Sequence, residues 1–476
     1  MSHEATAIAS IPEGFPSERL RSFRIIPRIE TYPSVVSFVQ TSLGKLALLM
    51  VFGLLLYVTD HQSWPVIACL ALTTFLPKWR HLTVSIGTLF YTGAILWMQA
   101  DHPLRALGLV ALVLIGGDIL VWMAARQVTP IGRHALLFLL GGFTSLILIC
   151  CWVPAHRHHR LSTLLWEFTL MLGTYVWFIG YVLLNHDVKP LHKFGLELGS
   201  IRPFWGSTNT PFPNGPACLR QIEARDPEQL AITQLKGLKL LVWSILLSLF
   251  LSAYTWFFHN YLGIPAYERA LYLSSVHMPL SPLVAWECVI LNFFRTLIDI
   301  SIWGHRIIAC CRMAGFEALR NTYRPLSSTT VADFFNRYYF YYKELVVRFF
   351  FFPAYHRLPA RWGKLRMTLA IFAAVGIGNA YYHFTREMGY LQDHTLWQGV
   401  KSFQVFFFYC MVLAAAISIS RMRDRPDPSR GFLRGTLIPA FLVSTFYCLL
   451  HIFASTDRTY TLLERLRFVG HLFFLS

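Results

Sequence analysis

Long apolar segments separated by short polar and basic stretches dominate the pattern of the chain. The apolar runs lie at about 44–59, 64–77, 83–99, 106–125, 134–153, 163–185, 237–258, 283–303, 333–353, 367–384, 399–420, 433–453 and 460–475. Since a helix needs about 20 apolar residues to cross a bilayer, most of these runs predict membrane-spanning helices. The runs at 64–77 and 460–475 are short, and we expect them to be tilted, re-entrant or interfacial. The pattern therefore predicts an all-α, polytopic integral membrane protein with about 11 crossings.

The composition and the placement of charge support the membrane setting. Of 476 residues, 55% are hydrophobic and only 14% are charged, against about 25% charged in an average soluble protein. A net charge of +17 would suggest nucleic-acid binding by a soluble protein. Here, however, the basic residues gather in alternate loops, as the positive-inside rule requires of cytoplasmic loops. We therefore expect no nucleic-acid partner and a cytoplasmic N-terminus.

The loops divide the chain into four parts. We expect a cytoplasmic N-terminal tail at 1–43, an N-terminal transmembrane bundle at 44–185, a cytoplasmic loop at 186–236, and a catalytic core with C-terminal helices at 237–476. The long loop is rich in proline, glycine and aromatic residues, which favours an ordered segment, either the wall of a substrate entrance or a linker. Near its end, Asp226 followed by Pro227 predicts the start of a helix. No internal repeat is evident, which weighs against the duplicated halves of many transporters.

Ionisable side chains interrupt the apolar sequence between Asp299 and Pro353. A charge inside a bilayer costs at least a few kcal/mol unless it is paired or faces water, so this block marks a protein interior or a reaction site. Charges spaced i,i+4 predict intrahelical ion pairs between Arg295 and Asp299, Asp333 and Arg337, and Glu344 and Arg348.

His383 stands out in the next apolar run, 367–384. Asn379 lies four residues before it and so on the same helix face. Imidazole is the side chain best matched to removing a hydroxyl proton near neutral pH and returning it to a leaving group. The competing interpretation is a histidine at the end of a span that meets lipid headgroups. The charged block before it favours the chemical interpretation.

A set of short motifs in this region resembles the membrane-bound O-acyltransferase (MBOAT) family. The motifs are Leu291-Asn-Phe-Phe-Arg295-Thr-Leu-Ile-Asp299, Arg312-Met-Ala-Gly-Phe316, Asn321-Thr-Tyr-Arg-Pro325, and Asp333-Phe-Phe-Asn-Arg337-Tyr-Tyr339 with the aromatic run to Pro353. The resemblance implies an MBOAT-like helical fold with His383 as the general base. The first polar active-site residue of the family aligns here with Tyr339, a departure from the usual His, Asn or Asp. Asn336, one turn earlier on the same helix face, is the nearest substitute, because positions i and i+3 are neighbours on a helix.

The resemblance implies transfer of an acetyl or longer acyl group from a thioester to a hydroxyl of a lipid, glycan or secondary metabolite. The co-substrate is then acyl-CoA or another acyl thioester, with no tightly bound cofactor and membrane lipids as partners. Residues expected to bind substrate or donor are Asn379, Arg337, Arg324, Arg312 and Asp333, because guanidinium groups match phosphates and the amide can orient the imidazole or stabilise an oxyanion. The arginines and Asp333 have structural interpretations as well.

Two other classes of function stay open. One is a transporter, and the other is a catalytically weakened MBOAT-like scaffold that binds a lipid or a protein partner. A metal site is not expected, because the nine cysteines include no C-x-x-C pair and the His/Arg tract at 156–160 has no neighbouring cysteine or carboxylate.

Overall fold

The computed structural model describes residues 25–127, 129–152, 160–185, 198–206, 212–213, 215–423, 431–455 and 458–475. Within these ranges the regular structure is entirely helical, and a single isolated bridge pairs Glu223 with Phe316. The predicted all-α class is confirmed. The first 24 residues of the predicted tail and most of the His/Arg tract lie outside the described residues.

The N-terminal helices are α2 (Pro33–Gln40), α3 (Ser42–Thr59), α4 (Trp64–Phe75), α5 (Arg80–Gln99), α6 (Pro103–Arg126), α7 (Pro130–Arg133), α8 (Ala135–Trp152), α9 (Arg160–Leu184) and α10 (Pro216–Gln221). The next are α11 (Pro227–Thr255), α12 (Tyr267–Ser275), α13 (Pro282–Met313), α14 (Val331–Tyr338), α15 (Phe340–Val346), α16 (Phe352–Arg357) and α17 (Lys364–Ile371). The last are α18 (Asn379–Arg386), α19 (Leu396–Ser402), α20 (Gln404–Met422), α21 (Ile438–His451) and α22 (Leu462–Leu472).

Eight helices in the described part of the chain are long and apolar enough to cross a membrane. They are Ser42–Thr59, Pro77–Gln99, Pro103–Arg126, Ala135–Trp152, Arg160–Leu184, Pro227–Tyr261, Gln404–Met422 and Leu433–His451. Many of their large side chains are exposed, among them Leu54 (64%), Leu137 (67%) and Phe441 (69%). Exposed apolar surface of this extent is favourable in contact with lipid and unfavourable in contact with water. The protein is therefore a multi-pass membrane protein.

The number of such helices is below the predicted number of about 11 crossings, for physical reasons that differ between segments. The apolar runs at 64–77 and 460–475 form α4, with 12 residues, and α22, with 11, and both are too short to cross by themselves. The run at 283–303 belongs to α13, whose 32 residues are long enough but include several charges. The runs at 333–353 and 367–384 are divided by irregular and π-helical turns.

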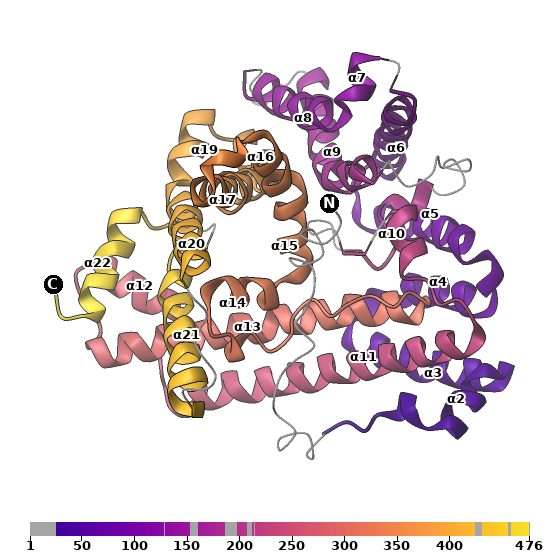
Figure 1. Cartoon of the computed structure of the whole chain (residues 1–476), viewed down its shortest axis with the longest axis horizontal. Helices are drawn as coiled ribbons and strands as arrows, with labels where there is room; N and C mark the ends of the chain where they lie inside the picture. The colour runs from indigo at the N-terminus through magenta and orange to yellow at the C-terminus, as the bar shows by residue number, and fades with distance from the viewer. Residues whose placement is uncertain are drawn as a thin grey trace.

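The two longest helices, α11 and α13, run side by side and antiparallel across the molecule (Figure 1). Asp226 caps α11, since its Oδ1 accepts a hydrogen bond from the Gln229 amide at 2.7 Å, which confirms the predicted start. α11 runs without interruption from Pro227 to Thr255, so its first turns belong to the segment predicted as the 186–236 loop. Gly237 allows the close approach, because a Cβ there would lie 3.0 Å from the Ala309 carbonyl oxygen.

Three loops that are far apart in the sequence meet at one end of this helix pair. The Ala224 amide donates to the Gly315 carbonyl at 3.0 Å, and the Glu317 amide donates to Ile222 at 2.6 Å. The buried Arg80 guanidinium donates to Glu223 Oε1 at 3.0 Å. The loops before α5, before α11 and after α13 therefore meet at the same end of the α11–α13 pair.

The described parts of the long loop pack into the protein. Phe204, Trp205, Phe212 and Leu219 belong to a buried cluster with α3, α4, α5, α11 and the end of α13. The Phe204 amide donates to Thr88 Oγ1 at 3.0 Å, and Trp205 Nε1 donates to the Pro213 carbonyl at 3.1 Å. These contacts hold the described residues of the loop against the helices.

The arrangement of loops predicts which positions are accessible from the same side of the membrane. Single cysteines at Lys78, Arg225 and Leu319, all exposed, should react together with a membrane-impermeant maleimide added from the cytoplasmic side. A cysteine at Met278, between α12 and α13 at the other end of the helix pair, should react only from the opposite side. The experiment uses a background in which Cys151 and Cys218, the native cysteines that are not fully buried, are replaced by serine. Labelling of Leu319 and Met278 from one side would contradict the arrangement.

Candidate functional site

The helix that was expected to carry both Asn336 and Tyr339 is broken between them. α14 ends at Tyr338, and Tyr339 adopts φ −145° and ψ 79°, outside the helical region. The interpretation that Asn336 and Tyr339 share a helix face is therefore wrong. Asn336 remains on α14 and is partly buried, whereas Tyr339 forms the joint before α15.

Hydrogen bonds from a distant segment cause this break. The Asn321 carbonyl accepts from the Phe340 amide at 2.9 Å, and Thr322 Oγ1 donates to the Tyr338 carbonyl at 2.9 Å. Asn321 is buried against Gly304 of α13, where a Cβ would come within 2.9 Å of the Asn321 side chain. Backbone groups that would continue the helix are paired with this segment instead, so the chain turns without losing hydrogen bonds.

The turn brings four polar or aromatic side chains together, here called the His383 cluster: Tyr339, Tyr342, Asn379 and His383. The Tyr342 hydroxyl donates to Asn379 Oδ1 in a buried hydrogen bond. The Tyr342 ring stacks on Tyr339 with centroids 5.8 Å apart and meets the His383 ring edge-on at 5.6 Å. Three predicted site residues thus converge on Tyr342, which sequence reasoning missed. Its only signal in the sequence is its position within the aromatic run that follows Tyr339.

The imidazole of His383 is enclosed by aromatic rings. Phe406 of α20 lies 4.3 Å from it between ring centroids, and Tyr382 lies 5.2 Å away. Nδ1 of His383 is buried and has no hydrogen-bond partner in the described structure. Because buried polar atoms are almost always paired in native proteins, this nitrogen is suited to a partner supplied by a bound substrate or by water.

Two π-helical segments support the cluster. Phe372–Gly378 connects α17 to α18 and leads directly into Asn379, and Val347–Phe351 follows α15. The two segments contact each other, and Gly378 faces the Phe350 ring so closely that a Cβ would lie 2.5 Å from it. Wide turns of this kind are common at functional sites because they redirect side chains that a regular α-helix would place elsewhere.

The residues predicted to bind the donor have different surroundings. Arg337 pairs with Asp333 at 3.0 Å and donates to Ser327 Oγ at 3.2 Å, which confirms one predicted ion pair. Arg312 is 8% exposed, and its Nε and Nη2 both donate to the Ala318 carbonyl. Arg324 is exposed, in a left-handed conformation with φ 48°. Arg312 and Arg337 therefore hold the segment between α13 and α14 in place, and Arg324 is the one of the three that faces outward.

The other two predicted ion pairs have opposite outcomes. Glu344 pairs with Arg348 at 3.4 Å and also with Lys343 at 2.5 Å. No ion pair joins Arg295 to Asp299 among the described residues, so that prediction is wrong. Both side chains are exposed and line a hollow beside α13, where solvation replaces the pairing that burial would require.

Arg320 is a further basic residue at this site that sequence reasoning missed. It is partly buried, and this burial lowers the pKa of its guanidinium. Tyr323 and Glu30 raise the pKa of Arg320, while the positive charge of Arg324 lowers it. Burial is the largest of these effects, and because an arginine stays charged in proteins, a bound anion would offset the solvation that burial removes. Arg320 and Arg324 belong to the segment between α13 and α14, residues 314–330, here called the basic segment. It connects to the His383 cluster, because the Asn321 carbonyl accepts from the Phe340 amide, two residues before Tyr342.

In the part of the chain that the structure describes, no three His, Cys, Asp or Glu side chains are grouped so that they could hold a metal ion.

Comparison of the sequence with protein-family models gives no match, and comparison with curated proteins gives none either. The hypothesis of function therefore depends on the motifs and on the geometry of the residues themselves.

Proposed function

We propose that this protein is a membrane O-acyltransferase of the MBOAT type, which moves an acyl group from a thioester to a hydroxyl with His383 as the general base. The observation that carries the proposal is the His383 cluster. It combines an imidazole that has a buried, unpartnered nitrogen with an oriented amide, inside a bundle of membrane helices. The motifs that resemble the family lie in the same region of the chain.

Each residue has a definite part in the proposed reaction. His383 accepts the proton of the acceptor hydroxyl, and the hydroxyl oxygen attacks the thioester carbonyl carbon. The carbon–sulfur bond then breaks, and the thiolate takes the proton back from the imidazolium. The Tyr342 hydrogen bond makes Asn379 Oδ1 an acceptor, so the amide nitrogen is left as a donor for the negative oxygen of the intermediate.

The donor would approach from the side on which the basic loops meet. A thioester of CoA carries phosphates, and Arg320 and Arg324 offer guanidinium groups near the turn that leads into Tyr342. Arg312 and Arg337 keep this segment in position through the Ala318 carbonyl and Asp333. The acceptor is a hydroxyl of a lipid, glycan or secondary metabolite.

A direct assay tests the proposal. The purified protein in lipid nanodiscs is incubated with acetyl-CoA or palmitoyl-CoA and with a panel of hydroxyl acceptors that includes diacylglycerol, a long-chain alcohol and a hexose. Release of free CoA together with a product heavier by the acyl group is expected. Binding of acyl-CoA without release or product for any acceptor would favour a scaffold, and counterflow of a solute across proteoliposomes without product would favour a transporter.

A further inference from the structure

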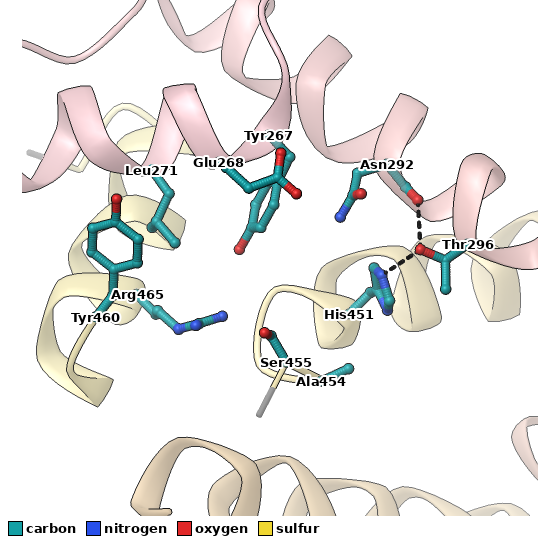
Figure 2. A pocket seen from close by; sticks show the side chains of 10 residues that line it. All are labelled: Tyr267, Glu268, Leu271, Asn292, Thr296, His451, Ala454, Ser455, Tyr460 and Arg465. Carbon is teal, nitrogen blue, oxygen red and sulfur yellow. Dashed lines mark hydrogen bonds between the residues drawn. The ribbon is translucent and has the colours of Figure 1, made fainter. Parts of the chain in front are cut away.

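A cavity of about 430 Å³ with several polar groups in its lining lies between α12, α13, α21 and α22, and none of its lining residues belongs to the His383 cluster (Figure 2). A second hollow of about 320 Å³ adjoins it and shares Glu268, Asn292 and Thr296 with it. Thr296 and Arg312 are separated by about 24 Å along the axis of α13, at about 1.5 Å per residue. The cavity therefore belongs to the other half of this helix from the basic segment. Its volume is in the range of small-molecule sites.

A chain of hydrogen bonds orients the histidine of this cavity. Thr296 Oγ1 donates to the Asn292 carbonyl at 3.0 Å and lies 3.1 Å from His451 Nε2 (Figure 2). Because the hydroxyl has one proton and gives it to the carbonyl, Nε2 of His451 must be the donor to Thr296. In the neutral ring Nδ1 is then an acceptor. No hydrogen bond occupies Nδ1 in the described part of the chain.

Buried side chains make the wall of the cavity rigid. The Tyr267 hydroxyl and Arg465 Nη1 both donate to the Ile452 carbonyl, at 3.2 and 2.6 Å. Tyr267 is 8% exposed and Arg465 is 1% exposed. These two contacts fix the end of α21 next to His451 and join it to α12 and α22. Four helices therefore form the cavity, and hydrogen bonds hold three of them, α12, α21 and α22, in fixed positions relative to one another.

The polar groups of the cavity and the adjoining hollow are mixed in character. Glu268 and Asp299 are acceptors, Arg295 is a donor, and the Asn292 amide is both. The two carboxylates are balanced by Arg295 and Arg465, so the formal charge of the lining is zero with neutral His451. Such a lining does not select an anion or a cation. It matches hydroxyl groups, each of which donates one hydrogen bond and accepts others.

We propose that this cavity binds a polyhydroxyl group, either a free sugar or polyol or the sugar headgroup of a glycolipid. The ligand hydroxyls donate to His451 Nδ1 and to the carboxylates, and they accept from Asn292 and Arg295. The proposal is independent of acyl transfer, because it is stated and tested as binding.

The test measures binding to the full-length protein in phosphatidylcholine nanodiscs. Glucose, myo-inositol and glycerol are titrated in turn by saturation-transfer difference NMR. In a second arm, native mass spectrometry follows monoglucosyl diacylglycerol added to the same nanodiscs. Saturable binding of glucose or myo-inositol indicates a free ligand, and specific retention of the glycolipid alone indicates a headgroup. Either result supports the site, and the absence of both overturns it.

Matched variants on α13 locate the binding. Thr296→Val keeps the shape of the side chain but removes the hydroxyl that orients His451, and a tenfold or larger loss of affinity is expected. Ser301→Ala is the control, because Ser301 Oγ makes the same kind of bond to the Leu297 carbonyl, at 2.8 Å, without lining the cavity. Equal affinities for wild type, Thr296→Val and Ser301→Ala would overturn the proposal. A fall in sugar affinity of tenfold or more between about 50 and 500 mM salt would also overturn it, because the ligand is neutral.

Discussion

Replacement of His383 with alanine is expected to lower the rate of acyl transfer by about 100-fold or more, because no other group of the His383 cluster can accept a hydroxyl proton near neutral pH. Tyr339 and Tyr342 have reference pKa values of about 10, and the amide of Asn379 is not a base. The measurement is the rate of CoA release with product identified by mass. Affinity for acyl-CoA, measured by its stabilisation of the protein against heat, should stay within about twofold of wild type, since the substitution leaves the basic segment intact.

The control for this prediction is His356→Ala. His356 is an exposed histidine at the end of α16, and its loss should leave the rate unchanged. His383→Gln distinguishes chemistry from packing, because glutamine keeps a polar side chain of similar length but has no titratable nitrogen. Full activity in His383→Gln would eliminate the general base. Loss of activity together with a lower unfolding temperature in His383→Ala, but not in His383→Gln, would assign the alanine effect to packing.

Replacement of Arg320 with alanine is expected to raise the KM for acyl-CoA about tenfold and to change kcat little. A hydrogen bond between charged groups contributes about 1.5–3 kcal/mol, and each 1.4 kcal/mol corresponds to a factor of ten. Arg320 is partly buried beside Arg324, so a phosphate there is attracted by two guanidinium groups in a partly desolvated setting. Steady-state kinetics with varied acyl-CoA at a fixed acceptor concentration give both parameters.

Salt supplies the second readout for Arg320. The KM of the wild type should rise between about 50 and 500 mM salt, and that of Arg320→Ala should rise less, since one of the attracting charges is gone. Arg126→Ala is the control, because Arg126 is an exposed arginine that stacks on Trp122 at the end of α6. A drop in kcat with unchanged KM would place Arg320 in support of the turn at Tyr339, and not in donor binding.

The fold was predictable from sequence where local properties decide it. Apolar runs of sufficient length marked every helix that meets the length and hydropathy of a span, and Asp226 with Pro227 marked the start of α11. The number of crossings stays a prediction, because eight helices in the described part of the chain meet the length and hydropathy of a span and about 11 crossings were expected. Hydropathy alone does not tell a full span from a shorter apolar helix. α4 has only 12 residues and ends shortly before Pro77, and other apolar runs are interrupted by π-helical turns.

The candidate site was predictable only in part. His383 and Asn379 were identified because their i,i+4 spacing on an apolar helix is visible in the sequence, and the Asp333–Arg337 and Glu344–Arg348 pairs follow from the same rule. The rule failed for Asn336 with Tyr339, because the helix between them is broken. The predicted ion pair between Arg295 and Asp299 does not form, because both side chains are exposed and line the hollow beside α13.

The sequence by itself determined that this is a helical, multi-pass membrane protein, and it marked His383 as the residue to test. Hydropathy and helical spacing are properties of neighbouring residues, so the chain order alone reveals them. Only the tertiary structure decided where the chain turns and what meets at the turn. Asn321 and Thr322 pair with backbone groups 16 or more residues away, and Tyr342 reaches Asn379 across 37 residues. The cavity at Thr296 and His451 joins helices 155 residues apart. Such contacts depend on how helices pack against one another, which no local pattern encodes.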